Sequence, residues 1–270
     1  MDEAAELLAT GSDRHQQLAQ GLREKLQSNP DDVMTAITLA SCIHTALVLG
    51  GSANIEQDMT EMEGLLLPHL AGVQHHPIFL ATAGKLLFFL GHHQLGEDLA
   101  NTALDAAPTH AAVLQIYAQI RMFCGDLEEA LEYFDYASSN CEPGSKFHAA
   151  IQVMKGQAYR ANGKMQQAAQ LVNDIVARDD NYRLQLNFAL LGDSEFIDEQ
   201  SNELAAMLNQ EQWQGIISQI FHISARPFVS EALRDRAMSG VVSLAHKHIG
   251  SACLISELEG STPGLYQRYR

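Results

Sequence analysis

Residues 125–134 read Gly-Asp-Leu-Glu-Glu-Ala-Leu-Glu-Tyr-Phe, and this stretch decides the fold class. A Gly-Asp turn opens it, and apolar residues follow at the three- and four-residue spacing of a helix with one buried face. The small Ala130 lets another helix approach closely, while the large Phe134 fills the space between units. Carboxylates at the helix start favour the helix dipole and solvate the outer side. The stretch therefore predicts the second helix of an antiparallel pair.

The same pattern recurs along the chain at a nearly fixed distance. Pro77–Leu80 aligns with Ala111–Leu114 at an offset of 34 residues, and a third unit starts near Ala149 at an offset of 38. The turns between paired helices are predicted at Gly91, Gly125 and Gly163. Small residues recur on the first helix of each unit, at Gly84, Ala118 and Gly156. No unit can bury its apolar face alone, so the units are expected to stack.

This period and these small and large positions resemble the tetratricopeptide repeat (TPR) family. The resemblance implies an all-α fold, an α-solenoid of antiparallel helix pairs wound as a right-handed superhelix, with a divergent helical C-terminal cap. Residues 77–182 carry three TPR-like units, and residues 31–73 look like a degenerate helix pair. Residues 1–30 are expected to contain an N-terminal helix, and residues 183–270 divergent C-terminal helices and a tail.

Outside the matched units, helices are predicted from apolar periodicity and breaks alone. A lone helix is expected over Asp13–Gln27, ended by Asn29-Pro30. The degenerate pair is expected to consist of Val33–Leu49, a turn at Gly50-Gly51, and Ile55–Leu70. Each break contains residues typical of turns between helices.

Composition narrows the classes of function. The 270 residues include 17 Lys and Arg against 33 Asp and Glu, a formal net charge of −16. This balance argues against sequence-independent binding of nucleic acid and against docking on an anionic membrane, because both need excess cations. No apolar run is long enough to predict a membrane span. The four cysteines are scattered without a C-x-x-C motif, which favours free thiols and a cytoplasmic location.

The sequence contains no motif typical of catalysis or metal binding. Histidines come in groups at 75–76, 92–93 and 246–248, and such close neighbours do not share a helix face, so they are poor chelators. The sequence therefore predicts a non-enzymatic protein with no catalytic residue, metal site or cofactor. The alternative is an enzyme built on the C-terminal part, whose candidate residues are His222, Arg226, Glu231, Arg234, Asp235 and Arg236.

In TPR arrays the first helix of each unit lines a concave groove, so the resemblance implies a partner site on these helices. The candidate groove residues are Ile78, Lys85, Phe88, Phe89, Gln115, Ile116, Gln119, Met122, Phe123, Met154, Gln157 and Arg160. An apolar groove with Met and amide side chains suits an amphipathic or extended peptide. The adjacent pairs Phe88-Phe89 and Met122-Phe123 can also be core, because one residue of each pair must point inward.

The predicted function is protein–protein interaction, most concretely as a cytoplasmic chaperone or adaptor of a bacterial secretion or assembly system. The TPR arrays that grip C-terminal carboxylates need Asn as well as Lys at set positions, and no Asn stands among these residues, which argues against that activity. One alternative is a regulatory protein that acts on transcription or signalling through a partner. Another is a scaffold that forms homodimers through C-terminal helices such as Pro227–His248.

Overall fold

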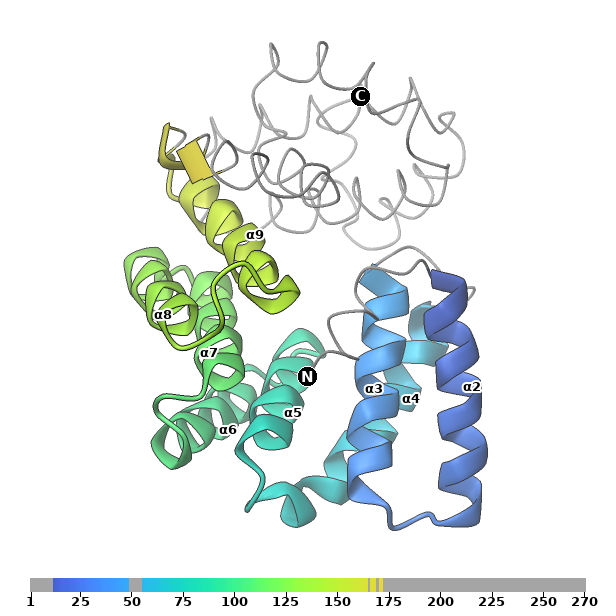
Figure 1. Ribbon diagram of the computed structural model, residues 1–270. Helices are drawn as coiled ribbons and strands as arrows, with labels where there is room; N and C mark the ends of the chain where they lie inside the picture. Colours follow the sequence, from blue (N-terminus) through green and yellow to red (C-terminus); the bar gives the residue numbers. More distant parts are fainter. Residues whose placement is uncertain (1–11, 49–54, 165, 169, 172–270) are drawn as a thin grey trace. The chain divides into compact units, whose positions relative to one another are not determined.

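The computed structural model describes residues 12–48, 55–164, 166–168 and 170–171 (Figure 1). The chain divides into two compact units, residues 1–151 and 152–270. Within the described residues every regular element is a helix, so the predicted all-α class is confirmed. The α-helices are α2 (Ser12–Ser28), α3 (Val33–Val48), α4 (Ile55–Leu66), α5 (Pro77–Phe89), α6 (His93–Ala106), α7 (Ala111–Cys124), α8 (Leu127–Ser139) and α9 (Lys146–Ala161). A 3-10 helix, η1 (Leu67–Val73), follows α4.

Helices in the first unit pack on their neighbours in the sequence. The close packings are α2 on α3, α3 on α4, α5 on α6 and α7 on α8. Successive pairs meet through α3 with α5 and through α5 with α7, and α6 also contacts α7 (Figure 1). We call α3, α5 and α7 the first helices, and α4, α6 and α8 the second helices. This packing is compatible with a helical repeat fold.

The repeat period of the sequence reappears in the helix starts and turns. α5 and α7 begin at Pro77 and Ala111, and α6 and α8 begin at His93 and Leu127, so both helices of the pair recur after one full period. The turns inside these two pairs use Gly91 and Gly125, with φ of 97° and 95°. Only glycine adopts this left-handed backbone without a steric penalty, so the chain reverses in the same way in both pairs.

The pair α5–α6 is held at close range by two facing glycines. A Cβ placed on Gly96 would lie 2.6 Å from the carbonyl oxygen of Gly84 and 2.9 Å from the backbone nitrogen of Phe88. The equivalent residues of the next pair are Ala118 and Ala130, both fully buried. The small residues that recur with the repeat therefore lie where paired helices are buried against each other.

Arg121 fastens the pair α5–α6 to the pair α7–α8. Its guanidinium hydrogen-bonds Glu97 on α6 and, at 3.2 Å, the Asp126 carboxylate at the start of α8. It also lies 5.4 Å from the ring centroid of Tyr117, within the range of cation–π attraction. The hydroxyl of Tyr117 in turn donates to Glu129 on α8, 3.1 Å away. These groups bind one another, which fits a structural role.

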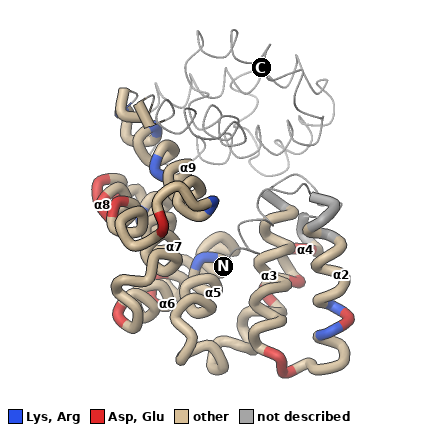
Figure 2. The backbone as a smooth tube through the Cα atoms, in the orientation of Figure 1, with Lys and Arg blue, Asp and Glu red and all other residues tan. Residues whose placement is uncertain are grey.

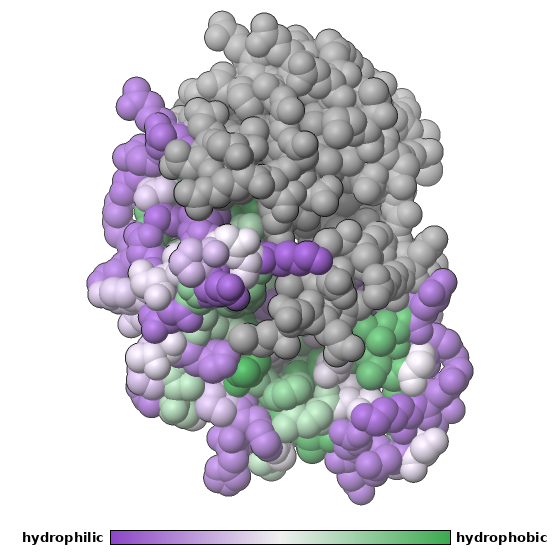
Figure 3. Space-filling model, in the orientation of Figure 1, coloured by the Kyte–Doolittle hydropathy of each residue, from purple (hydrophilic) through white to green (hydrophobic). Residues whose placement is uncertain are grey.

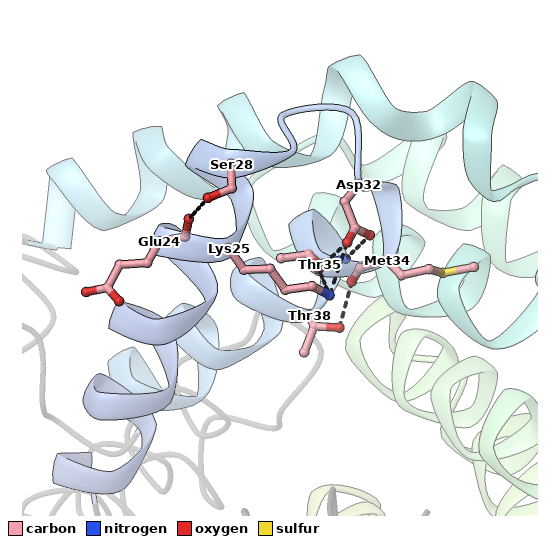
Figure 4. Close-up of polar contacts among 7 residues, drawn as sticks. All are labelled: Glu24, Lys25, Ser28, Asp32, Met34, Thr35 and Thr38. Carbon is pink, nitrogen blue, oxygen red and sulfur yellow. Dashed lines mark hydrogen bonds and ion pairs between the residues drawn. The ribbon is translucent and has the colours of Figure 1, made fainter.

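A polar cluster fixes the turn between α2 and α3 (Figure 4). One carboxylate oxygen of Asp32 accepts from the backbone N–H of Thr35 at 3.1 Å, and the other accepts from the Thr35 hydroxyl at 2.8 Å. The ammonium of Lys25 lies 3.1 Å from Asp32 and 2.7 Å from the Thr35 hydroxyl oxygen. These hydrogen bonds, the backbone one first, and Lys25 lower the pKa of Asp32 to about 2.

Replacement of this carboxylate should reduce the acid sensitivity of the first unit. The Asp32 pKa is 3.8 in the unfolded chain and lower in the fold, so its stabilising effect is complete above pH 3.8 and disappears as pH falls through about 2. We expect Asp32→Asn to lower the free energy of unfolding at pH 7. Between pH 4 and 2, the free energy of unfolding should decrease less in this variant than in the unsubstituted chain. Urea denaturation followed by circular dichroism measures both. The exposed neighbour Asp31→Asn is the control, and equal acid profiles for the two variants would refute the assignment.

Two elements differ from the sequence prediction. The helix expected over Ile55–Leu70 is α-helical only to Leu66 and then tightens into η1, because Pro68 cannot donate a backbone hydrogen bond to the preceding turn. The helix expected to stand alone over Asp13–Gln27 is α2, and it packs on α3. The turn predicted at Gly50-Gly51 and the helices predicted within 183–270 lie outside the described residues.

Candidate functional site

Charged residues divide between the two kinds of helix (Figure 2). The first helices contain no Asp or Glu, and their Lys and Arg are limited to Lys85 on α5 and Arg121 on α7. The second helices α4, α6 and α8 contain four, three and four carboxylates and no Lys or Arg. The acidity of the first unit therefore lies largely on the second helices, and the side of the first helices turned away from them is the candidate site.

Eight residues define this side of α5 and α7, which we call the α5–α7 face. They recur at i, i+4, i+7 and i+11 and so share one side of each helix. On α5 they lie about a quarter turn or more from Gly84, which faces α6. On α7 they lie equally far from Ala118, the equivalent of Gly84. The residues of the face are Ile78, Thr82, Lys85 and Phe89 on α5, and Ala112, Ile116, Gln119 and Phe123 on α7. Two of them are buried: Ile116 is 6% exposed and belongs to the apolar core, and Gln119 is 8% exposed.

An aromatic row crosses the three first helices. The ring of Phe89 lies 4.9 Å from that of His44 on α3 and 4.8 Å from that of Phe123 on α7, centroid to centroid. These tilted and edge-on contacts fall within the range at which aromatic rings attract. All three rings are partly exposed. On the face of the described residues that Figure 3 draws, apolar residues lie between hydrophilic ones. We call these three residues the aromatic row.

The structure separates the adjacent aromatic and Met residues that the sequence left open. Phe88 is 5% exposed and contacts Gly96 and the ring of His93, so it belongs to the core of the pair α5–α6. Met122, its equivalent in the next repeat, is 1% exposed and also core. Phe89 and Phe123 instead take part in the aromatic row. Of each adjacent pair, the first residue fills the helix pair and the second borders the α5–α7 face.

Three polar side chains on or beside this face, Lys85, Gln115 and Gln119, have no partner among the described residues, whereas the Thr82 hydroxyl donates to the Ile78 carbonyl oxygen at 2.8 Å. No ion pair or hydrogen bond joins the Lys85 ammonium to any described residue, and the side-chain amides of Gln115 and Gln119 make no hydrogen bond to one. Burial lowers the pKa of Lys85 to about 8, because desolvation disfavours the charged form. Arg121, on the other side of α7, is instead held by Glu97 and Asp126. Hydrogen-bonding capacity is thus left over on one side of α7.

The remaining candidate residues lie on α9, in the second unit. Met154 is partly exposed and Gln157 is buried. Arg160 is 4% exposed, and burial lowers its pKa to about 10. Its Nε and one terminal nitrogen make no hydrogen bond to a described residue. In the alignment of the third unit Arg160 matches Met122, at the register position that is core in α5 and α7.

Reactive groups are few in the described part of the chain. No set of three His, Cys, Asp or Glu residues there is arranged to hold a metal ion. Burial raises the pKa of Cys42 and Cys124 to about 11, so both stay protonated near neutral pH and are poor nucleophiles. None of the described helices combines the length and the apolar character needed to cross a bilayer. The C-terminal residues considered for an enzyme lie outside the described ranges.

His44 is the member of the aromatic row that sequence reasoning missed. Phe89 and Phe123 occupy equivalent positions of successive repeats, so their match is visible in the sequence. The number of residues between His44 and Phe89 does not fit the repeat period, so His44 does not stand out in the same way. No family model and no curated protein matches the chain.

Proposed function

We propose that this chain is a TPR-like α-solenoid protein that binds a segment of a partner protein on the α5–α7 face. The observation that carries the proposal is a partly exposed aromatic row beside two partly exposed polar residues, Lys85 and Gln115. The Lys85 ammonium and the Gln115 amide have no hydrogen-bond or ion-pair partner among the described residues. Rings supply apolar contact area, and amides donate to and accept from a peptide backbone. The proposed cellular role is that of a cytoplasmic chaperone or adaptor of a bacterial secretion or assembly system.

The repeat geometry supports the TPR-like part of the proposal. Helix starts and glycine turns recur with the period of the sequence, and the small positions Gly84 and Gly96 allow the close approach expected of a repeat pair. The low charge of the first helices supports the binding part, because a protein-binding surface is poor in charge at its centre.

An apolar contact at the edge of the face offers the most direct test. Ile78 on α5 is 38% exposed, so it can be replaced with little effect on the fold. The full chain would be panned with a random dodecapeptide phage library, and the affinity of enriched peptides measured by calorimetry. We expect Ile78→Gln to weaken their binding roughly tenfold, the effect of losing one apolar side-chain contact.

Met59→Gln is the matched control, since Met59 is 39% exposed and lies on the second helix α4. It should bind the same peptides as the unsubstituted chain does. Equal affinity of both variants, or an equal loss in both, would remove the α5–α7 face as the binding site.

A further inference from the structure

Lys85 is a charged side chain without an ion-pair partner in the part of the chain that the structure describes. It is the one charged residue of the α5–α7 face, and no carboxylate of the described residues pairs with it. An ammonium removed from water without a counter-ion destabilises a fold, because no attraction offsets the lost hydration. Other cations of the first unit are paired with carboxylates: Arg23 with Glu61, Lys25 with Asp32, and Arg121 with Glu97. Lys85 therefore differs from these groups in having no carboxylate partner among the described residues.

We propose that the partner segment is an acidic peptide that places an Asp or Glu side chain against Lys85 and, two residues away, an apolar side chain against the aromatic row. This inference rests on the proposed function, because it assigns the chemistry of the segment bound there. It concerns an acidic residue within an extended segment.

The spacing along α5 sets the spacing of the peptide. Phe89 follows Lys85 by four residues, which is about 6 Å along a helix axis. In an extended chain, side chains two residues apart point to the same side and lie about 7 Å apart. An acidic residue opposite Lys85 therefore brings the residue two positions away opposite the ring of Phe89. Gln119 stands at the position of α7 equivalent to Lys85 and is 8% exposed, so the charge of the face lies on α5 alone.

The distribution of charge favours one acidic side chain over a polyanion. A nucleic acid would bring many phosphates toward the carboxylates of α4, α6 and α8, with only Lys85 on the face to attract it. A single peptide carboxylate beside Lys85 is paired at short range, and at about 0.15 M salt charges more than about 8 Å away are largely screened. A basic segment would place a second cation beside Lys85 and leave both without a counter-ion.

The test uses the full chain and the peptides enriched by panning. We expect these peptides to share an Asp or Glu two positions from an apolar residue. For one such peptide, changing the acid to its amide should weaken binding to the unsubstituted chain by about 10- to 100-fold, as for a charge-assisted hydrogen bond. When the protein is the Lys85→Met variant, changing the peptide acid to its amide should alter the affinity by less than about twofold. Such a difference between the two proteins is the signature of coupled groups in a double-mutant cycle. Lys85→Arg keeps the charge and should keep the preference.

The outcomes separate this inference from the function on which it rests. If Ile78→Gln weakens binding but enriched peptides lack an acidic position, or lose equal affinity on amide substitution with and without Lys85, the acidic-peptide inference is overturned and the binding face remains. If enriched peptides bind independently of Ile78, the proposed function itself fails. Enrichment of basic peptides would also overturn the inference.

Discussion

Gly96→Ala is expected to lower the free energy of unfolding of the first unit by about 1–3 kcal/mol, the range for overpacking a tight interior. The added Cβ would meet the carbonyl oxygen of Gly84 at 2.6 Å and the Cβ of Phe88 at 2.7 Å. Two of its nearest neighbours are backbone atoms of α5, so relief requires the two helices to move apart. Because Phe88 is core, that movement would also disturb packing beyond the glycine contact. Urea denaturation followed by circular dichroism measures the loss.

The same chemical change at Gly64 should have the opposite sign. Gly64 lies inside α4, and no atom stands within 4 Å of a Cβ placed there. Alanine restricts the unfolded chain more than glycine and favours helix, so Gly64→Ala should stabilise by about 0.5–1 kcal/mol. If both variants shift stability in the same direction, close approach of α5 and α6 is not what requires glycine at position 96.

Lys85→Met is expected to raise stability at neutral pH, by at most about 3 kcal/mol, the free energy that corresponds to a fall in the Lys85 pKa from 10.5 to about 8. Met has a similar length and no charge to desolvate. Lys85 keeps partial exposure, so the gain should lie below that limit. If the variant is more stable and has lost its preference for acidic peptides, then Lys85 destabilises the fold and contributes to binding.

The gain should depend on pH in a defined way. Between about pH 8 and 10.5 the unfolded chain holds the Lys85 proton and the folded chain has released it, so stability of the unsubstituted chain rises with pH relative to Lys85→Met. The buried thiols Cys42 and Cys124 act oppositely from pH 9 to about 11, because their pKa is raised in the fold. They are present in both proteins, so the difference between the two unfolding curves isolates Lys85. A difference that stays constant from pH 7 to 10.5 would contradict the desolvation of this group.

The helix pairs of the first unit could be predicted because their signals are local. Gly91 and Gly125 mark turns that require a left-handed backbone, and the apolar spacing between turns is that of helices. The predicted end of α4, Leu70, lies beyond the observed end at Leu66, although Pro68 is present in the sequence. A proline two residues beyond the helix end is compatible with either a stop or a kink, and the packing around η1 decides between them.

The site was harder to predict because it depends on how each helix is rotated about its axis. Phe88 and Phe89 differ by about 100° in direction, and the facing glycines Gly84 and Gly96 determine which ring points inward. That clue was in the sequence, since Gly84 and Phe88 lie four residues apart on one helix side. The desolvation of Lys85 and the contact of His44 with Phe89 depend on residues that are distant in the sequence, so no local sequence pattern predicts them.

Packing between helices that are close in the sequence also bears on how the first unit reaches its fold. The pairs α2–α3, α3–α4, α5–α6 and α7–α8 each close a short loop. The contacts α3–α5 and α5–α7 pass over only α4 with η1, and over α6. Short loops lose little entropy on closure, and chains dominated by such local contacts fold in microseconds to milliseconds. During synthesis at about 5–20 residues per second, each pair would have time to form soon after its second helix leaves the ribosome. Sequential packing therefore limits the time for which the unpaired apolar sides of α3, α5 and α7 are open to misassociation.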